Sequence, residues 1–191
     1  EYLKKIQGIP YKNTKFKMLL DLLRKAISRY SKTNKFKAEE FSKRMKELVN
    51  RYNNRDGSIM VSNDDVINEF IDSLSEEARK ILEDLQKDAE AFKEMGITFE
   101  EKAFYDILKA IKEKYEFEYA EDKLIELAKK VKAVVDDKAK YTDWSSKSDI
   151  KASLQSDIIR LLNRNGYPPM TFEDVYARVI AQVENFKKFA D

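Results

Sequence analysis

Apolar residues recur at helical spacing along almost the whole chain, and this periodicity limits the fold more than any other feature. Each stripe places large side chains three or four residues apart, so that they line one face of a helix. The first of these stripes is Phe16, Leu19, Leu20, Leu23 and Ile27. Alternation of apolar and polar residues never persists beyond a few positions, as a half-buried strand would require. The pattern predicts an all-α fold, an irregular bundle of about seven helices with one long member.

Glycine and proline are scarce, with 4 Gly and 3 Pro in 191 residues, and several of them mark expected helix ends. A sandwich or barrel of strands needs many more such turn residues. Gly96 and Gly166 each follow an apolar stripe and fit the position just past a helix C-terminus. The pair Pro168-Pro169 cannot continue a helix. Thr98 begins a capping-box sequence, and Thr171 is expected to cap the last helix.

The longest stripe runs from Ile67 to Phe92 and allows two interpretations. Its spacing predicts one continuous helix of about 30 residues. Ser75, followed by two glutamates, also fits a helix start. Residues 63–95 therefore form either one helix or two helices with a break near residues 73–75. The length of the chain suits a single helical domain spanning residues 1–191.

The composition removes most kinds of active site, because the chain has no Cys and no His. A thiolate nucleophile, a disulfide framework, a Ser-His-Asp triad and the usual zinc ligands are all excluded. The four glycines lie too far apart to form a phosphate-binding loop. We therefore expect no catalytic, cofactor-binding or metal-binding residue. No apolar run approaches the roughly 20 residues of a spanning helix, so we expect no membrane contact, and a cysteine-free chain fits the cytoplasm.

Charge is distributed unevenly along the chain. Residues 1–55 carry 16 Lys and Arg against 5 Asp and Glu, whereas residues 56–128 carry 9 against 21. Either the basic stretch packs beside the acidic one, or the basic stretch faces DNA or an acidic partner. Under the second interpretation, five cations are candidates for contacts with the DNA backbone. They are Lys12, Lys15, Lys17, Arg24 and Lys25.

Three motifs stand out in the rest of the sequence. One begins at Asp143-Trp144, continues through a basic amphipathic helix and ends at Gly166-Tyr167-Pro168-Pro169. Another is Glu101 followed by Ala103-Phe104-Tyr105-Asp106-Ile107-Leu108. The third is a Phe-Ser pair at residues 41–42 followed by a Tyr-x-Asn-Arg run at residues 52–55. In this order, the motifs resemble the C-terminal helical region of the restriction (motor, R) subunit of type I restriction endonucleases.

The resemblance implies a role that the residue chemistry alone does not. It identifies the chain as part of a longer subunit with a nuclease domain and two helicase-like lobes that use ATP and Mg²⁺. The helical part is expected to have no catalytic activity and to dock that subunit onto the methyltransferase–specificity core. The alternatives are a DNA-contacting module and an intramolecular brace for the helicase lobes. The candidate partner contacts are Tyr105, Asp106, Trp144, Tyr167 and Pro168.

Overall fold

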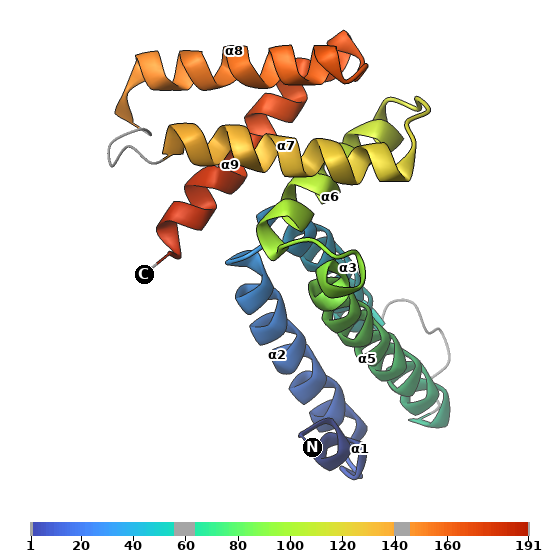
Figure 1. Ribbon diagram of the computed structural model, residues 1–191. Coiled ribbons are helices and arrows are strands. Elements are labelled where there is room, and N and C mark those ends of the chain that lie inside the picture. Colours follow the sequence, from blue (N-terminus) through green and yellow to red (C-terminus); the bar gives the residue numbers. More distant parts are fainter. Residues whose placement is uncertain (1, 56–63, 140–145, 191) are drawn as a thin grey trace. The chain divides into compact units, whose positions relative to one another are not determined.

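The computed structural model describes residues 2–55, 64–139 and 146–190, and these residues form an all-α protein without a strand (Figure 1). The prediction of an all-α fold is confirmed. The helices are α1 (Tyr2–Gln7), α2 (Lys12–Ser31), α3 (Lys35–Asn53), α5 (Asp64–Glu94), α6 (Phe99–Lys114), α7 (Glu121–Ala139), α8 (Ser148–Arg164) and α9 (Phe172–Lys188), with a short 3-10 turn, η2 (Pro169–Thr171), before the last one.

The long stripe forms one helix, α5, of 31 residues. The alternative with a break near residues 73–75 is therefore wrong. Ser75 does not start a new helix, because its hydroxyl donates a hydrogen bond of 2.9 Å to the carbonyl of Ile71 within α5. The side chain of Ser75 is 1% exposed, so this bond satisfies a hydroxyl that would otherwise be buried without a partner.

The chain divides into two compact units. Unit 1 comprises residues 1–31 and 38–91, and unit 2 comprises residues 32–37 and 92–191. Each unit has its own cluster of buried apolar side chains. The expectation of a single domain over residues 1–191 stays a prediction beside this division.

Unit 1 contains α1, α2 and most of both α3 and α5. Its helices are held together by one apolar core, to which all four helices contribute. The largest fully buried side chains of this core are Ile6, Phe16, Leu23, Leu48, Ile71, Leu74, Ile81 and Leu82. Apart from Ile6, these residues occupy the apolar stripes that the sequence shows, so the periodicity located most of the core of this unit correctly.

Polar contacts fix the direction of α2 against α5 within unit 1. Lys12 forms an ion pair with Asp72, and the hydroxyl of Tyr30 donates to Asp88 over 2.6 Å. From the first contact to the second, residue numbers rise along both helices, so α2 and α5 run parallel.

The contacts of α3 run the other way. Arg44 pairs with Asp84 at 2.8 Å, and the guanidinium of Arg51 donates to both carboxylate oxygens of Glu77 at 3.0 and 2.7 Å. Residue numbers rise along α3 as they fall along α5, so these two helices are antiparallel. Unit 1 is consequently an up-down-up bundle of three helices, with α1 packed on α2.

Unit 2 is built from α6, α7, α8 and α9, which form a closed circuit of contacts. α6 packs on α7, α7 on α8, α8 on α9, and α9 back on α6. Figure 1 shows α7 and α8 lying side by side while α9 crosses them. α6 is the most enclosed helix, because every residue from Lys102 to Leu108 is buried.

Three helices end in the same hydrogen-bonded turn, and two of these ends use the predicted glycines. Gly96 and Gly166 have φ of 66° and 71°, in the left-handed region that glycine adopts without strain. After α8, the amide of Gly166 donates to Asn163 and that of Tyr167 to Leu162, which is the Schellman arrangement. The third end has Glu116 at φ 52° in place of glycine.

The predicted caps of α6 and α9 have different outcomes. Thr98 accepts a hydrogen bond from the amide of Glu101, whose side chain accepts from the amide of Thr98, so the capping box is confirmed. Thr171 makes no such bond, and the prediction that its side chain caps α9 is wrong. Its hydroxyl donates instead to the carbonyl of Pro168 over 2.7 Å. The short turn η2 before α9 brings that carbonyl within reach.

Candidate functional site

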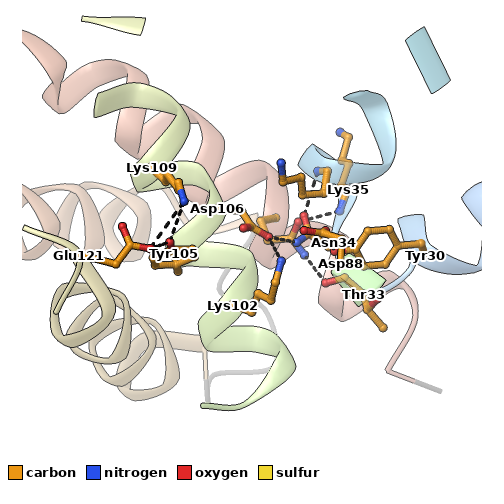
Figure 2. A network of polar contacts seen from close by, with 12 residues as sticks. Tyr30, Thr33, Asn34, Lys35, Asp88, Lys102, Tyr105, Asp106, Lys109 and Glu121 are labelled. Carbon is orange, nitrogen blue, oxygen red and sulfur yellow. Dashed lines mark hydrogen bonds and ion pairs between the residues drawn. The ribbon is translucent and has the colours of Figure 1, made fainter. Parts of the chain in front are cut away.

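Four of the buried polar side chains belong to one group within unit 2, which we call the polar clasp. It consists of Asn34, Lys102, Asp106 and Gln182, each between 2% and 5% exposed. Lys102 and Asp106 form an ion pair of 2.7 Å between Nζ and Oδ2. Asn34 donates a second bond of 2.7 Å to the same carboxylate oxygen (Figure 2). Two donors on one buried carboxylate offset part of the cost of removing its charge from water.

Asn34 serves two elements at once. Its side-chain oxygen accepts from the amide of Lys37 at 3.0 Å, which caps the start of α3. Its side-chain nitrogen donates to Asp106 on α6. One amide therefore ties the segment of residues 32–37 to α6, using its acceptor for the cap and a donor for the clasp.

α9 holds the same segment from its own side. The side-chain amide of Gln182 accepts from the backbone nitrogen of Lys35 at 3.0 Å and donates to the carbonyl of Thr33 at 3.2 Å. Asn185 donates to the carbonyl of Lys32 at 3.2 Å. The connection between α2 and α3 is thus an integral part of unit 2, bound by polar contacts from both α6 and α9.

A second polar group lies on α6 beside the clasp. Figure 2 shows Tyr105 pointing away from Asp106, toward Glu121 and Lys109. The hydroxyl of Tyr105 donates to the carboxylate of Glu121, and Lys109 donates to that hydroxyl at 3.2 Å. Burial, followed by the hydrogen bond to the negative carboxylate, raises the pKa of Tyr105. The tyrosine is therefore a neutral donor that joins α6 to the start of α7.

Tyr167 anchors the turn that follows α8. It is 1% exposed, and its hydroxyl donates to the carbonyl of Leu108 at 2.6 Å. Its ring packs edge-on against Phe117 and Tyr119, with centroids 5.0 and 5.3 Å apart. Burial raises the pKa of Tyr167, so this side chain also stays neutral. The turn starts from a residue fixed in the core of unit 2.

The turn itself places apolar atoms in solvent. Pro168 is half-buried, and its carbonyl accepts from both the amide and the hydroxyl of Thr171. Between these residues, Pro169 is exposed and Met170 is 64% exposed. With Tyr167 and Thr171 buried at either end, the turn has little freedom to fold Met170 away. We call residues 168–170 the exposed turn.

Asp174 secures the start of α9 just beyond the exposed turn. Although its burial opposes the effect, hydrogen bonds from Lys114 and Arg178 lower the pKa of Asp174. The two contacts measure 2.7 and 2.8 Å. Arg178 also lies 4.8 Å from the ring centre of Phe36. Lys114, at the end of α6, and Tyr167, just after the end of α8, therefore hold the two sides of the exposed turn in place.

Open grooves also lie on unit 2. One of about 390 Å³ separates α7 from α8 and has Val134 and Leu161 in its lining, with cations and carboxylates around them. Lys138 and Asp157 form a 3.2 Å ion pair in it. Within the described ranges, no group of three or more acidic side chains could hold a metal ion, and no helix is both long and apolar enough to cross a bilayer.

The candidate partner contacts from the sequence occupy different environments. Tyr105, Asp106 and Tyr167 are buried and hydrogen-bonded inside unit 2, whereas Pro168 is half-buried in the exposed turn. Trp144 lies outside the described residues. The structure does not bring Tyr105 and Tyr167 into one surface. Their roles as partner contacts stay predictions, and burial leaves three of these side chains little area to offer a partner.

The cations predicted to contact DNA also differ from one another. Lys12 pairs with Asp72 on α5. Arg24 and Lys25 share Asp21 at 3.6 and 2.8 Å. Over the described ranges, Lys15 and Lys17 make no side-chain hydrogen bond or ion pair, and Lys17 is exposed. The contact of Lys12 with the acidic stretch agrees with the first of the two charge interpretations, whereas Asp21 belongs to the basic stretch itself.

Sequence reasoning missed Asn34 and Gln182, the two amides of the polar clasp. Asn34 lies between two apolar stripes and Gln182 lies within the last one, and neither residue belongs to a motif. The single sequence signal was the position of Asn34 just before α3, where Asn is a favoured N-cap.

The fold and these surfaces define a helical module with fixed polar contacts and an exposed turn. Residues 1–189 match the family model described as "Type I restriction enzyme HindI endonuclease subunit-like, C-terminal". The chain belongs to this family, the C-terminal domains of type I restriction enzyme endonuclease (R) subunits. The resemblance that the three motifs carry is confirmed.

Two relatives with names agree with the family. The type I restriction enzyme HindI endonuclease subunit of Haemophilus influenzae is 28% identical over 96% of this chain. A protein named as the MjaIXP type I restriction enzyme endonuclease subunit, from Methanocaldococcus jannaschii, is 26% identical over 87% of it. The chain spans 16% and 15% of the lengths of these two relatives. No solved structure matches the chain significantly.

Proposed function

We propose that this chain is a non-catalytic assembly domain of a type I restriction enzyme R subunit. In this role it docks the ATP-dependent translocase and endonuclease onto the methyltransferase–specificity core. The family match over nearly the whole chain supports the proposal, because both relatives are about six times longer than the chain and leave room for catalytic parts elsewhere. ATP and Mg²⁺ belong, in this proposal, to those other parts, and the assembly works in the cytoplasm.

The observation that carries the proposal is the exposed turn. An exposed apolar side chain on a fixed backbone segment loses no backbone entropy on binding, and Met is among the residue types enriched at interfaces. Met170 meets this description, because Tyr167 and Thr171 fix the turn on either side of it. The buried motif residues Tyr105 and Tyr167 then act by holding the shape of unit 2, and Met170 with Pro168 makes the contact.

A pull-down tests the proposal directly. The chain of 191 residues is immobilised and exposed to a purified core of modification and specificity subunits. We expect the core to bind, and Met170→Glu to weaken binding about ten-fold or more, as a central interface residue does. Tyr11→Glu is the matched control, because Tyr11 is 73% exposed in unit 1. Its binding is expected to equal that of the original chain.

Two results would contradict docking. One is failure of the original, folded chain to bind the core. The other is retention of the chain by the helicase lobes of the subunit with no affinity for the core, which would favour the intramolecular brace instead.

A further inference from the structure

The cations of α2 and α3 fall into two groups according to what they contact. Lys12, Arg44 and Arg51 each reach a carboxylate of α5 within unit 1. These three side chains lie along the lines of contact between the helices. Each of these charges is matched by a carboxylate of α5, so the three pairs add little to the field around the bundle.

The second group consists of exposed side chains on α2 and α3. In the described part of the chain, Lys17, Arg29, Lys43 and Lys46 make no side-chain hydrogen bond or ion pair. Arg24 and Lys25 are exposed beside this group, and both contact the carboxylate of Asp21.

Four of these exposed cations lie at one level of unit 1. The hydroxyl of Tyr52 donates to Asn13 at 2.6 Å, and the rings of Tyr30 and Phe41 lie 6.3 Å apart. The two contacts make α2 and α3 antiparallel neighbours and set their register. Interpolating between the contacts places Lys43 and Lys46 level with Arg24 and Lys25. On α2, Lys17 and Arg24 are seven residues apart, about 10 Å along the same side of the helix.

The exposed sides of α2 and α3 lack the apolar centre of a protein interface. The large apolar side chains that are exposed in the described residues are Tyr11, Val66, Phe99, Met170 and Phe189. Of these, only Tyr11 lies near α2, one residue before its start, and none is on α3. Interfaces between proteins have cores rich in aromatic residues and poor in charges, whereas contacts to phosphates need cations alone.

We propose that the exposed sides of α2 and α3 bind the phosphate backbone of duplex DNA. The contact residues are Lys17, Arg24, Lys25, Arg29, Lys43 and Lys46. The choice of DNA as the polyanion rests on the proposed function, which places the chain in an assembly that acts on DNA. Contacts of this kind do not read bases, so the binding is independent of sequence and steepens the dependence of affinity on salt.

A salt titration with a labelled duplex tests this proposal. Fluorescence anisotropy measures the affinity of the whole chain for a DNA of about 30 base pairs between low and moderate salt. The test variant combines Lys17→Gln, Arg29→Gln, Lys43→Gln and Lys46→Gln. We expect affinity to fall and the slope of log K against log salt to decrease by about 0.9 for each phosphate that the variant no longer neutralises. Two unrelated DNA sequences should bind equally.

A matched variant separates a local surface from net charge. Lys80→Gln, Lys87→Gln, Lys123→Gln and Arg164→Gln remove the same charge from exposed positions on α5, α7 and α8. This control should keep the original slope. Circular dichroism verifies folding, and the pairs Lys17/Arg29 and Lys43/Lys46 are tested separately if the fourfold variant does not fold.

Three outcomes would overturn the proposal. They are no DNA binding by the original chain at low salt, equal reductions in test and control variants, and binding of an acidic protein surface by the same cations without DNA affinity. Docking to the modification and specificity subunits is scored in the separate pull-down. A variant that no longer binds DNA but still docks therefore supports both proposals, and a failure of docking alone leaves the DNA result standing.

Discussion

Lys102 and Asp106 lie one turn apart on α6 and form a 2.7 Å ion pair, although each side chain is only 4% exposed. Two charges out of water are stable only where their mutual attraction and further hydrogen bonds offset the missing hydration. Asn34 supplies such a bond to the Asp106 carboxylate. The stability of unit 2 therefore depends on the completeness of this group, and removal of one member should cost more than removal of an exposed ion pair.

Lys102→Met tests the ion pair itself. The variant leaves the Asp106 carboxylate buried without its cation, and we expect the free energy of unfolding to fall by about 3–5 kcal/mol. Urea denaturation measures the change. Lys109→Met is the matched control on the same helix, because the Lys109 side chain is 44% exposed and its pair with Glu121 should contribute about 0–1 kcal/mol. Equal destabilisation in the two variants would contradict the assignment.

Asn34→Asp separates the two roles of Asn34. Aspartate caps a helix about as well as asparagine, so the bond from Lys37 is kept. The donor to Asp106 disappears and a second carboxylate takes its place, so we expect a destabilisation beyond the roughly 1.5–3 kcal/mol of a hydrogen bond to a charged group. Urea denaturation at neutral and at mildly acidic pH measures it. The destabilisation should shrink at the lower pH, and an unchanged value would count against carboxylate repulsion.

The sequence located the helices well because their signals are local. Apolar spacing, Gly96, Gly166 and the capping box at Thr98 each depend on a few neighbouring residues. The end of α6 carried no comparable signal, since Glu116 occupies a position where glycine is the usual residue. Thr171 failed as a predicted cap because the 3-10 turn before α9 offers its hydroxyl a closer acceptor.

The polar clasp could not be predicted, because its members are distant in the sequence. Asn34 and Asp106 are 72 residues apart, and Lys35 and Gln182 are 147 apart. The motif containing Asp106 marked the residue as important but gave no reason. The same motif is equally compatible with an Asp106 that contacts another protein. Only the fold shows that Asn34 and Lys102 donate hydrogen bonds to its carboxylate.

Glu116→Gly should stabilise the protein. A residue with a side chain incurs a steric cost in the left-handed region, and glycine avoids it while losing more freedom on folding. The balance gives an expected gain of about 0.5–1 kcal/mol. Glu116→Ala is the control, since it removes the charge and keeps the Cβ. Thermal unfolding of both variants measures the effect, and a stabilised Glu116→Ala would point to charge instead of backbone strain.

Tyr105 and Tyr167 should make stability fall at high pH. Burial raises the pKa of both hydroxyls in the folded protein, so above about pH 10 the unfolded chain loses protons that the folded chain keeps. The contribution of each tyrosine to the free energy of unfolding is fully present below that pH. Above it, the free energy of unfolding decreases by up to about 1.4 kcal/mol per pH unit for each tyrosine. Urea denaturation from about pH 8 to about pH 11 measures the slope. Tyr167→Phe should give a shallower slope, and an identical one would refute this account.

Arg51 and Glu77 provide a test of the antiparallel arrangement of α3 and α5. Their contact is bidentate, but both side chains are more than 40% exposed, so water screens the pair and its energy is about 0.5–1 kcal/mol. Arg51→Glu should destabilise unit 1 by that amount or slightly more, because two carboxylates then face each other. Adding Glu77→Arg should restore most of the stability, and urea denaturation of the double-mutant cycle measures the coupling.

The same exchange at Arg79 and Glu83, which pair within α5, is the control. It reports on a pair inside one helix and is independent of α3. Absence of coupling between residues 51 and 77, with coupling retained at 79 and 83, would contradict this alignment of α3 against α5.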